Sequence, residues 1–526
     1  MRTREGMSHR MCRGVSIIWT VPAPGRYNAH AMTTSNPSST SNTPEQGAGS
    51  AKRTSRRSRE GAAPASSQPP ASLWDEAPER EPALPDAAPR SAIRDSLYDL
   101  IPLGALELDV LDTPEFVRLQ GVKQLGFCYR VWPGATHTRF EHSLGVYYLM
   151  LRALRMLRTR AVNTPNAISA DATDLRTLLA AALLHDVGHY PFSHAIEELG
   201  YPIVPHERVG RRIIEGTNIA GVLERHGLRP ERVADLVDPP RDHSLPPSDA
   251  LLIRLLSGPL DVDKLDYLPR DARACNVPYG GVDVTRLLGS LRVLTVDGVR
   301  RLGVSDKGIS PLNSLLHARQ EMFDNVYWHH TNRAMMAMLL RAVQEAMEAG
   351  QLAPEDLYGQ DDASLLALFS QERMPEGTRA LVGALRMRRP YKVLLEVSAR
   401  AGRLFNQLDA LFWDQPKRRR VEMALAGSLN EALDMPVAPT DVLVDVPKPE
   451  KWEMDVQVSF KRPPVGMAAQ MSWADATGQR PSDLGIYEQH QRRIRIVSCE
   501  PLRDAIHAQS QAEQLLLPVL ERLPML

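Results

Sequence analysis

Apolar residues recur at helical spacing through most of residues 93–290, and this pattern predicts one helix after another. Segment 292–304 departs from it, because two runs of β-branched and leucine residues flank an Asp-Gly pair, which is typical of a two-residue β-hairpin. Helical spacing resumes near Ser310. Residues 91–420 are therefore predicted to form a mainly α core with a short β-hairpin insertion.

The pattern changes to an alternation of apolar and polar positions after about residue 420. Three short segments are typical of strands, namely residues 441–446, 456–460 and 493–497. Residues 508–517 have the apolar spacing of a closing helix. We therefore expect a small C-terminal α+β lobe over residues 421–526, in a chain whose fold class is mainly α.

The N-terminal residues have a different composition, dominated by Ser, Pro, Ala and Arg. They contain no periodic apolar face, and such segments cannot bury enough surface to offset the entropy of the chain. Residues 1–90 are therefore predicted to form a disordered tail. Its basic stretch 52–59 could contact nucleic acid or a membrane, although a solvated tail is the interpretation that we favour.

The whole chain is electrically balanced, with 63 basic and 63 acidic side chains. Nonspecific binding of nucleic acid depends on excess positive charge, so nucleic acid is a possible partner but not a required one. The four cysteines include no C-x-x-C pair, which is typical of a reducing compartment. No apolar run approaches the roughly 18 residues that a membrane span needs. The composition favours a cytoplasmic protein that does not enter a membrane.

Histidine is concentrated in one part of the chain. Six of the 15 histidines fall within residues 137–206, far more than an even spread would place there. Four residues form an H…HD…D pattern, namely His142, His185, Asp186 and Asp263. Two imidazoles and two carboxylates suit Mn²⁺, Mg²⁺, Fe²⁺ or Zn²⁺ and leave positions open for water and a phosphate, whereas structural zinc prefers thiolates. We predict a site for a divalent metal.

The His185-Asp186 pair follows an apolar run, residues 178–184, whose length and composition predict a helix. Adjacent residues on a helix lie about 100° apart, so both side chains could reach one ion. A lone His-Asp pair carries little meaning. Charged side chains beside apolar runs, however, are rarely buried without a partner or a metal, and Asp263 lies in a similar context.

Three longer segments, residues 124–146, 185–194 and 261–271, resemble the HD-domain dNTP triphosphohydrolases, in particular those that combine a SAM domain with an HD domain. The resemblance covers roughly residues 93–526, with no SAM domain ahead of it. It implies an HD-domain helical core in which the H…HD…D residues hold the metal. It also implies a dNTP substrate, attack at the α-phosphate, release of deoxynucleoside and intact triphosphate, and a homo-oligomer, either a dimer or a tetramer.

The resemblance also assigns roles around the substrate. The residues placed around the reacting phosphate are His189, His194, Glu197, His206 and Glu207. The residues placed against the substrate are Gln124, Leu125, Arg139, Lys264, Tyr267, Asp271, Arg319 and Tyr327. The three cations among them would neutralise the triphosphate. Gln124 and Asp271 would bind the 3′-hydroxyl, and Tyr327 would pack on the deoxyribose where a 2′-hydroxyl would clash.

Residue spacing agrees with part of this assignment. Asp263, Tyr267 and Asp271 recur every four residues, so they share one helix face, and segment 319–327 has the same spacing. Pro269 disturbs the first set, because a proline inside a helix removes a hydrogen bond and costs about 3 kcal/mol. We expect a kink between Tyr267 and Asp271.

Two other functions stay open at this point. A phosphohydrolase for another phosphoester, such as a guanosine alarmone or a cyclic nucleotide, would keep the metal ligands. It would not need Lys264, Asp271, Arg319 and Tyr327 together. A non-catalytic module that binds single-stranded nucleic acid or a partner through the basic tail would have no physical reason to keep an intact ligand set. Metal-dependent hydrolysis of dNTPs is the leading hypothesis.

Overall fold

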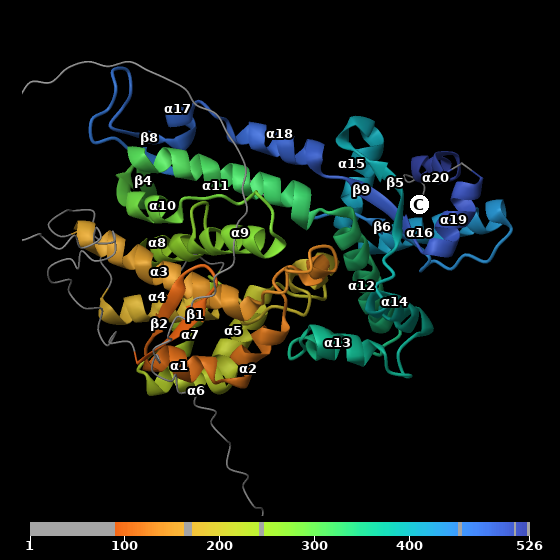
Figure 1. Cartoon of the computed structure of the whole chain (residues 1–526), viewed down its shortest axis with the longest axis horizontal. Coiled ribbons are helices and arrows are strands. Elements are labelled where there is room, and N and C mark those ends of the chain that lie inside the picture. The colour runs from red at the N-terminus through yellow and green to blue at the C-terminus, as the bar shows by residue number, and fades with distance from the viewer. Residues whose placement is uncertain (1–89, 162–170, 241–246, 451–454, 510–511, 523–526) are drawn as a thin grey trace, which may run out of the picture. The chain divides into compact units, whose positions relative to one another are not determined.

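The computed structural model describes residues 90–161, 171–240, 247–450, 455–509 and 512–522. Within these ranges the chain is mainly helical and its strands form small sheets, which confirms the predicted fold class (Figure 1). The predicted disordered tail lies outside the described residues, except for its last residue. Among the described helices, none combines the length and the apolar character that crossing a membrane requires.

The described chain begins with a hairpin that the sequence pattern did not predict. Strands β1 (Ser91–Asp95) and β2 (Asp99–Leu103) pair antiparallel, where continuous helices were expected from residue 93. The first helices follow, α1 (Ala105–Leu111) and α2 (Pro114–Val117). Only the second strand carries fully buried apolar residues, so the hairpin has almost no periodic signal in the sequence.

The helical core is built around α3 (Arg139–Ala161), α4 (Ala172–Leu184) and α9 (Val262–Cys275), with α3 packed against both of the others. Helix α4 is apolar on nearly all sides, as expected for a helix at the centre of a core. The carboxylate of Asp171 caps its first turn. The surrounding helices are α5 (His206–Gly216), α6 (Asn218–Arg225), α7 (Pro230–Val237), α8 (Pro247–Leu256) and α10 (Val284–Ser290).

The predicted Asp-Gly hairpin is present as β3 (Leu291–Val296) and β4 (Val299–Ser305). Its two turn residues have positive φ values of 49° and 76°, as a hairpin turn of this kind requires. The hairpin is not an isolated insertion. Strand β4 pairs in parallel with β7 (Gln457–Ser459), which pairs with β8 (Gln470–Ser472). This pairing crosses the predicted domain boundary at residue 421.

A long helical segment links the core to the rest of the chain. Helix α11 (Ile309–Met322) continues into a π-helical turn, Phe323–Tyr327, which precedes α12 (His330–Glu348). Helix α12 packs against the segment η3 (Ser193–Leu199), against strand β6 (Val442–Asp445), and against α14 (Glu376–Arg386). Helix α13 (Asp362–Phe369) lies beside α14. In Figure 1, α12 lies between the helical core and the C-terminal sheet.

The C-terminal sheet has the order β5-β9-β6, with both pairs antiparallel, formed by β5 (Lys392–Val397), β9 (Ile494–Ser498) and β6 (Val442–Asp445). Strands β6, β7 and β9 match the three predicted strands, but β5 and β8 were not predicted. The helices here are α15 (Arg403–Asp409), α16 (Gln415–Leu433), α17 (Trp473–Thr477), α18 (Pro481–Gln491), α19 (Glu500–Ala508) and α20 (Ala512–Glu521). The predicted closing helix at 508–517 has wrong bounds. Helix α19 ends at Ala508, where the predicted helix begins, and α20 runs from Ala512 to Glu521.

Candidate functional site

The four predicted metal ligands lie on, or directly after, three helices of the core. His142 lies in the first turns of α3, and Asp263 lies in the first turn of α9. His185 and Asp186 directly follow α4, which ends at Leu184, so the pair lies in a turn and not on the helix as predicted. The turn packs tightly on α5, because a Cβ at Gly188 would collide with backbone atoms of that helix.

The structure brings these four side chains together. His142 Nε2 lies 3.0 Å from an Asp263 oxygen and 3.5 Å from an Asp186 oxygen. His185 Nε2 lies 3.3 Å from Asp186 and 3.8 Å from Asp263. Ligand atoms of His142, His185 and Asp186 lie within 4.8 Å of one another, a spacing at which they could hold one metal ion.

Each imidazole is oriented through its other nitrogen. His142 Nδ1 lies 2.8 Å from an Asp266 carboxylate oxygen, and His185 Nδ1 lies 3.0 Å from the carbonyl oxygen of Ala182. Both Nε2 atoms are buried and have no hydrogen-bond partner of normal geometry among the described residues. Holding Nδ1 in this way fixes the ring and leaves Nε2 as an electron-pair donor, which is how proteins orient metal-binding histidines.

Asp266 belongs to a buried charge network that the sequence reasoning missed. Arg270 donates to both Asp266 oxygens at 2.8 and 2.9 Å and to Asp95 at 2.8 Å. The i,i+4 spacing of Asp266 and Arg270 on α9 was a signal that could have found this pair. Burial lowers the pKa of His142, but the carboxylates of Asp263 and Asp266 outweigh it and raise the pKa to about 10. The surroundings therefore favour a positive charge at this point.

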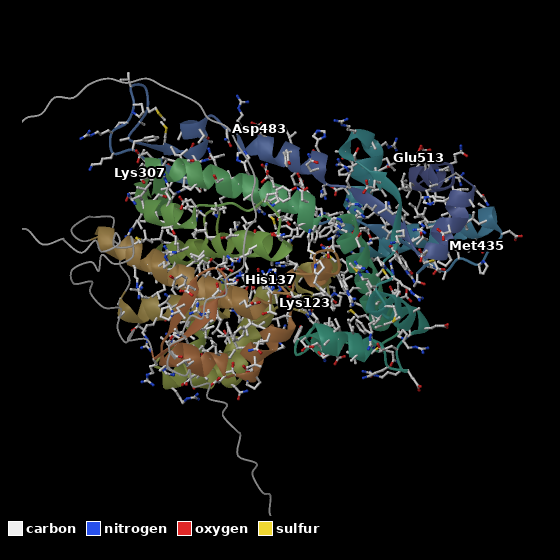
Figure 2. The ribbon with its side chains drawn as sticks, in the orientation of Figure 1. Lys123, His137, Lys307, Met435, Asp483 and Glu513 are labelled. Atoms are coloured by element: carbon white, nitrogen blue, oxygen red, sulfur yellow. The ribbon has the colours of Figure 1, made fainter. Side chains whose placement is uncertain are left out.

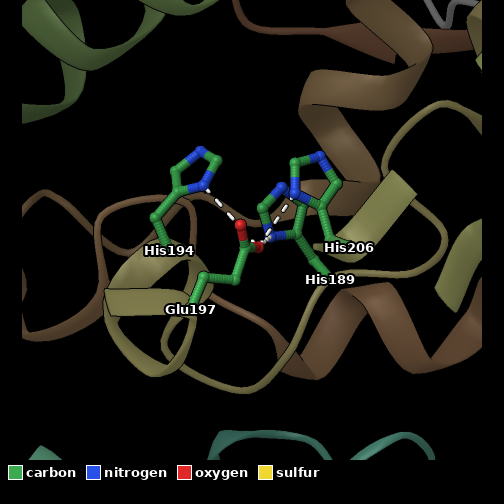
Figure 3. Close-up of side chains that lie close together, drawn as sticks. All are labelled: His189, His194, Glu197 and His206. Carbon is green, nitrogen blue, oxygen red and sulfur yellow. Dashed lines mark hydrogen bonds and ion pairs between the residues drawn. The ribbon is translucent and has the colours of Figure 1, made fainter. Parts of the chain in front are cut away.

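A second cluster adjoins the first and contains His189, His194, Glu197 and His206 (Figure 3). One Glu197 oxygen lies 2.8 Å from His206 Nδ1, 3.7 Å from His189 Nδ1 and 3.8 Å from His194 Nδ1. The His189 and His206 rings are stacked with their centroids 3.7 Å apart. Asp186 connects this second cluster to the predicted metal ligands, because one of its carboxylate oxygens lies 3.2 Å from His189 Nε2.

The members of this second cluster differ in charge and exposure. Burial lowers the pKa of His206, but the charge of Glu197 outweighs it and raises the pKa to about 9. Burial and the nearby positive charges of Arg139 and His206 hold the pKa of His189 well below its usual value. The His194 side chain is 61% exposed, so it alone of the three histidines opens to solvent. Glu207 lies 3.6 Å from His206 and is partly exposed.

The three predicted phosphate-binding cations all have partners in the structure. Arg139 is buried and donates to Asp186 at 2.6 Å and to Ser193 at 3.0 Å, so it contacts one of the predicted metal ligands. Lys264 donates to Asp261 at 2.6 Å. Arg319 donates to Glu450 at 2.9 Å. Contact of these cations with a triphosphate stays a prediction.

The predicted sugar-binding residues lie together at one side of the site. Tyr327 donates to Asp271 at 2.8 Å, and the other Asp271 oxygen lies 2.7 Å from His137 Nε2. The backbone N–H of Gln124 donates to the backbone carbonyl of His137. The buried side-chain oxygen of Gln124 has no hydrogen-bond partner among the described residues. Figure 2 places Lys123 and His137 next to each other, in agreement with the β-bridge between Lys123 and Thr138.

The two remaining predicted substrate-binding residues are partly buried against the core. Leu125 and Tyr267 pack on the main hydrophobic cluster, and the Tyr267 ring lies 6.4 Å from that of His142. Pro269 does not end the helix, since α9 runs from Val262 to Cys275, and the kink expected at this residue stays a prediction. Packing of α9 against α3 and α11 compensates for the single lost amide donor.

Comparison with known proteins agrees with this geometry. A family model described as HD domain matches residues 139–266, which contain all four predicted ligands. The chain therefore contains an HD domain. A second model, described as HD associated region, matches residues 282–513 of this HD-domain protein and includes Arg319 and Tyr327.

Curated relatives of the HD-domain protein include an uncharacterized protein of Methanocaldococcus jannaschii, 35% identical over 53% of this chain and 54% of that protein. The uncharacterized protein YwfO of Bacillus subtilis is 33% identical over 46% of this chain and 52% of that protein. The deoxynucleoside triphosphate triphosphohydrolase SAMHD1 of Homo sapiens is 31% identical over 48% of this chain and 44% of that protein. The chain spans about half the length of the curated relatives that it matches.

Proposed function

We propose that this HD-domain protein is a divalent-metal-dependent dNTP triphosphohydrolase that releases deoxynucleoside and triphosphate. The observation that carries the proposal is the pair of buried Nε2 atoms on His142 and His185. Among the described residues they have no hydrogen-bond partner of normal geometry, and they face the carboxylates of Asp186 and Asp263. This donor set fits a hard or borderline divalent cation. When bound, such a cation would polarise a phosphoryl oxygen and lower the pKa of a water molecule.

The neighbouring cluster supplies groups that can handle protons during phosphoester hydrolysis. His206 is held as a cation by Glu197 and can donate to a phosphoryl oxygen through Nε2. His189 is held neutral, so one ring nitrogen can accept a proton. His194 is exposed and turns Nδ1 towards Glu197, which leaves Nε2 to protonate the leaving 5′-oxygen.

The substrate class is argued from the other side of the site and from the relatives. Asp271 is held between Tyr327 and His137 by short hydrogen bonds, which fixes a carboxylate where it can accept a sugar hydroxyl. Tyr327 is fixed in turn and can exclude a 2′-hydroxyl. The relative SAMHD1, which is 31% identical over 48% of this chain, carries the name deoxynucleoside triphosphate triphosphohydrolase. A homo-oligomer, dimer or tetramer, and a cytoplasmic location belong to the same proposal.

The test is an assay of products. The purified chain is stripped with a chelator, reloaded with Mn²⁺ or Mg²⁺, and incubated with each dNTP and rNTP, and the products are resolved by ion-exchange chromatography. We expect deoxynucleoside and triphosphate from dNTPs, and little turnover of rNTPs. His226→Ala is a matched control, because His226 pairs with Asp109 away from the site. Monophosphate with pyrophosphate, or turnover only of another phosphoester, would contradict the proposal.

A further inference from the structure

The segment that precedes α13 contacts the loop between the ligand Asp186 and His194. Arg118 bridges the two, because one guanidinium nitrogen donates to the carbonyls of His189 and Gln360, both at 2.9 Å. The other nitrogen donates to the carbonyl of Val187 at 2.7 Å. The turn that follows the metal ligands is thus fastened to the HD-associated region.

Asp362, the first residue of α13, makes a second connection. One of its oxygens accepts the N–H of Phe192 at 2.7 Å, and the other accepts the N–H of Lys123 at 3.1 Å. The Asp362 side chain is almost fully buried. The two segments that it joins also bond directly, because the Ser193 hydroxyl donates to the Lys123 carbonyl at 2.7 Å. A single carboxylate therefore joins the segment that carries Gln124 to the one that carries His194.

The backbone at this junction has a conformation that needs support. Phe192 and Ser193 have φ values of 59° and 60°, so two consecutive residues with side chains adopt the left-handed region. Such residues are disfavoured there and persist when their surroundings hold them. The Phe192 ring stacks on Phe127 with centroids 4.3 Å apart, but its only amide hydrogen is held by Asp362. This reversal of the chain sets the direction of the segment that begins with His194.

We propose that Asp362, assisted by Arg118, is a positioning residue that holds the left-handed turn at Phe192–Ser193 and thereby aims His194 at the reacting phosphate. The inference rests on the proposed function for its catalytic consequence. Asp362 contacts neither the predicted metal ligands nor the predicted substrate-binding side chains. Its removal should therefore change the rate of the reaction more than the binding of metal or substrate.

Asp362→Asn tests the inference with almost no change in volume. The amide has one acceptor oxygen, so it can serve Phe192 or Lys123 but turns an NH₂ group towards the other N–H. A displacement of a catalytic group by about 1 Å can cost about 100-fold, and we expect kcat to fall by about 10–100-fold. KM should change less than about threefold and metal content should stay that of the wild type. Hydrogen exchange, read by mass spectrometry, should quicken in peptides covering 187–196.

Asp361→Asn is the matched control. Asp361 caps the same helix and accepts the N–H of Ser364 at 2.7 Å, and asparagine caps a helix equally well. This variant should keep the wild-type kcat and exchange pattern. If Asp362→Asn does not fold, Arg118→Lys replaces it, because lysine keeps the charge but cannot reach Val187 and Gln360 at once. That variant should show the same loss of kcat and the same local increase in exchange.

Several results would overturn the inference. Wild-type kcat in Asp362→Asn would do so, as would equal losses in Asp361→Asn or faster exchange spread over the whole chain. The exchange measurement needs no substrate. If the wild-type protein does not hydrolyse dNTPs but Asp362→Asn still loosens residues 187–196 selectively, the proposed function fails while the positioning contact stands. If dNTPs are hydrolysed and exchange is unchanged, the positioning role fails alone.

Discussion

The buried carboxylate of Asp362 should leave a measurable mark on the pH dependence of stability. Burial raises the pKa of Asp362 from 3.8 to about 6. The amide donors of Phe192 and Lys123 and the charge of the Lys123 side chain oppose this rise, and the neighbouring Asp361 adds to it. The guanidinium of Arg118 also faces the two carboxylates. These are the charged groups around Asp362.

A raised pKa means that the folded state holds this proton more tightly than the unfolded state. Between about pH 4 and pH 6 the folded chain therefore binds more protons, and the free energy of unfolding falls as the pH rises through this window. A rise of about two pKa units corresponds to about 3 kcal/mol over the full range. Between pH 4.5 and 7.5, where the protein can be studied conveniently, the contribution amounts to about 2 kcal/mol.

The perturbation is Asp362→Asn, which removes the titration. Urea unfolding of both proteins at half-unit steps from pH 4.5 to 7.5 gives the difference in unfolding free energy, wild type minus variant, and cancels the other titrating groups. We expect this difference to fall by about 2 kcal/mol across the series. Asp361→Asn should show no comparable trend. A difference that stays constant, or that rises with pH, would refute the reasoning.

Three further predictions concern the metal ligands, the proton donor and the core. Asp263→Ala should lose bound metal and turnover while its circular dichroism stays unchanged, and wild-type metal content would contradict the ligand assignment. His194→Ala should keep its metal but lose about 10²–10⁴-fold in kcat, so near-normal turnover would exclude a proton-transfer role. Arg333→Met should lower the free energy of unfolding by about 3–5 kcal/mol, because the buried carboxylates of Glu198 and Asp445 lose their shared partner. A loss below about 1 kcal/mol in urea unfolding would show that this triad is dispensable.

Local sequence was sufficient for much of the fold. The Asp297-Gly298 hairpin was predictable because only a few residue types accept positive φ at both turn positions. Helix α4 was predictable from its apolar run, and strands β6 and β9 from their alternation. Within the site, the four predicted metal ligands fall in short motifs, and the structure places them within reach of one another.

The tertiary structure alone decided the contacts between segments that are distant in the sequence. The parallel pairing of β4 with β7 joins residues about 150 positions apart, and nothing in either strand specifies its partner. From the sequence, Asp362 is simply the first residue of a helix, and only the fold shows that it accepts the backbone N–H of Phe192, 170 positions earlier. Arg333 likewise gains its role only from Glu198 and Asp445. Spacing along the chain predicts which face of a helix a residue occupies, but which distant segment covers that face depends on how the whole core packs.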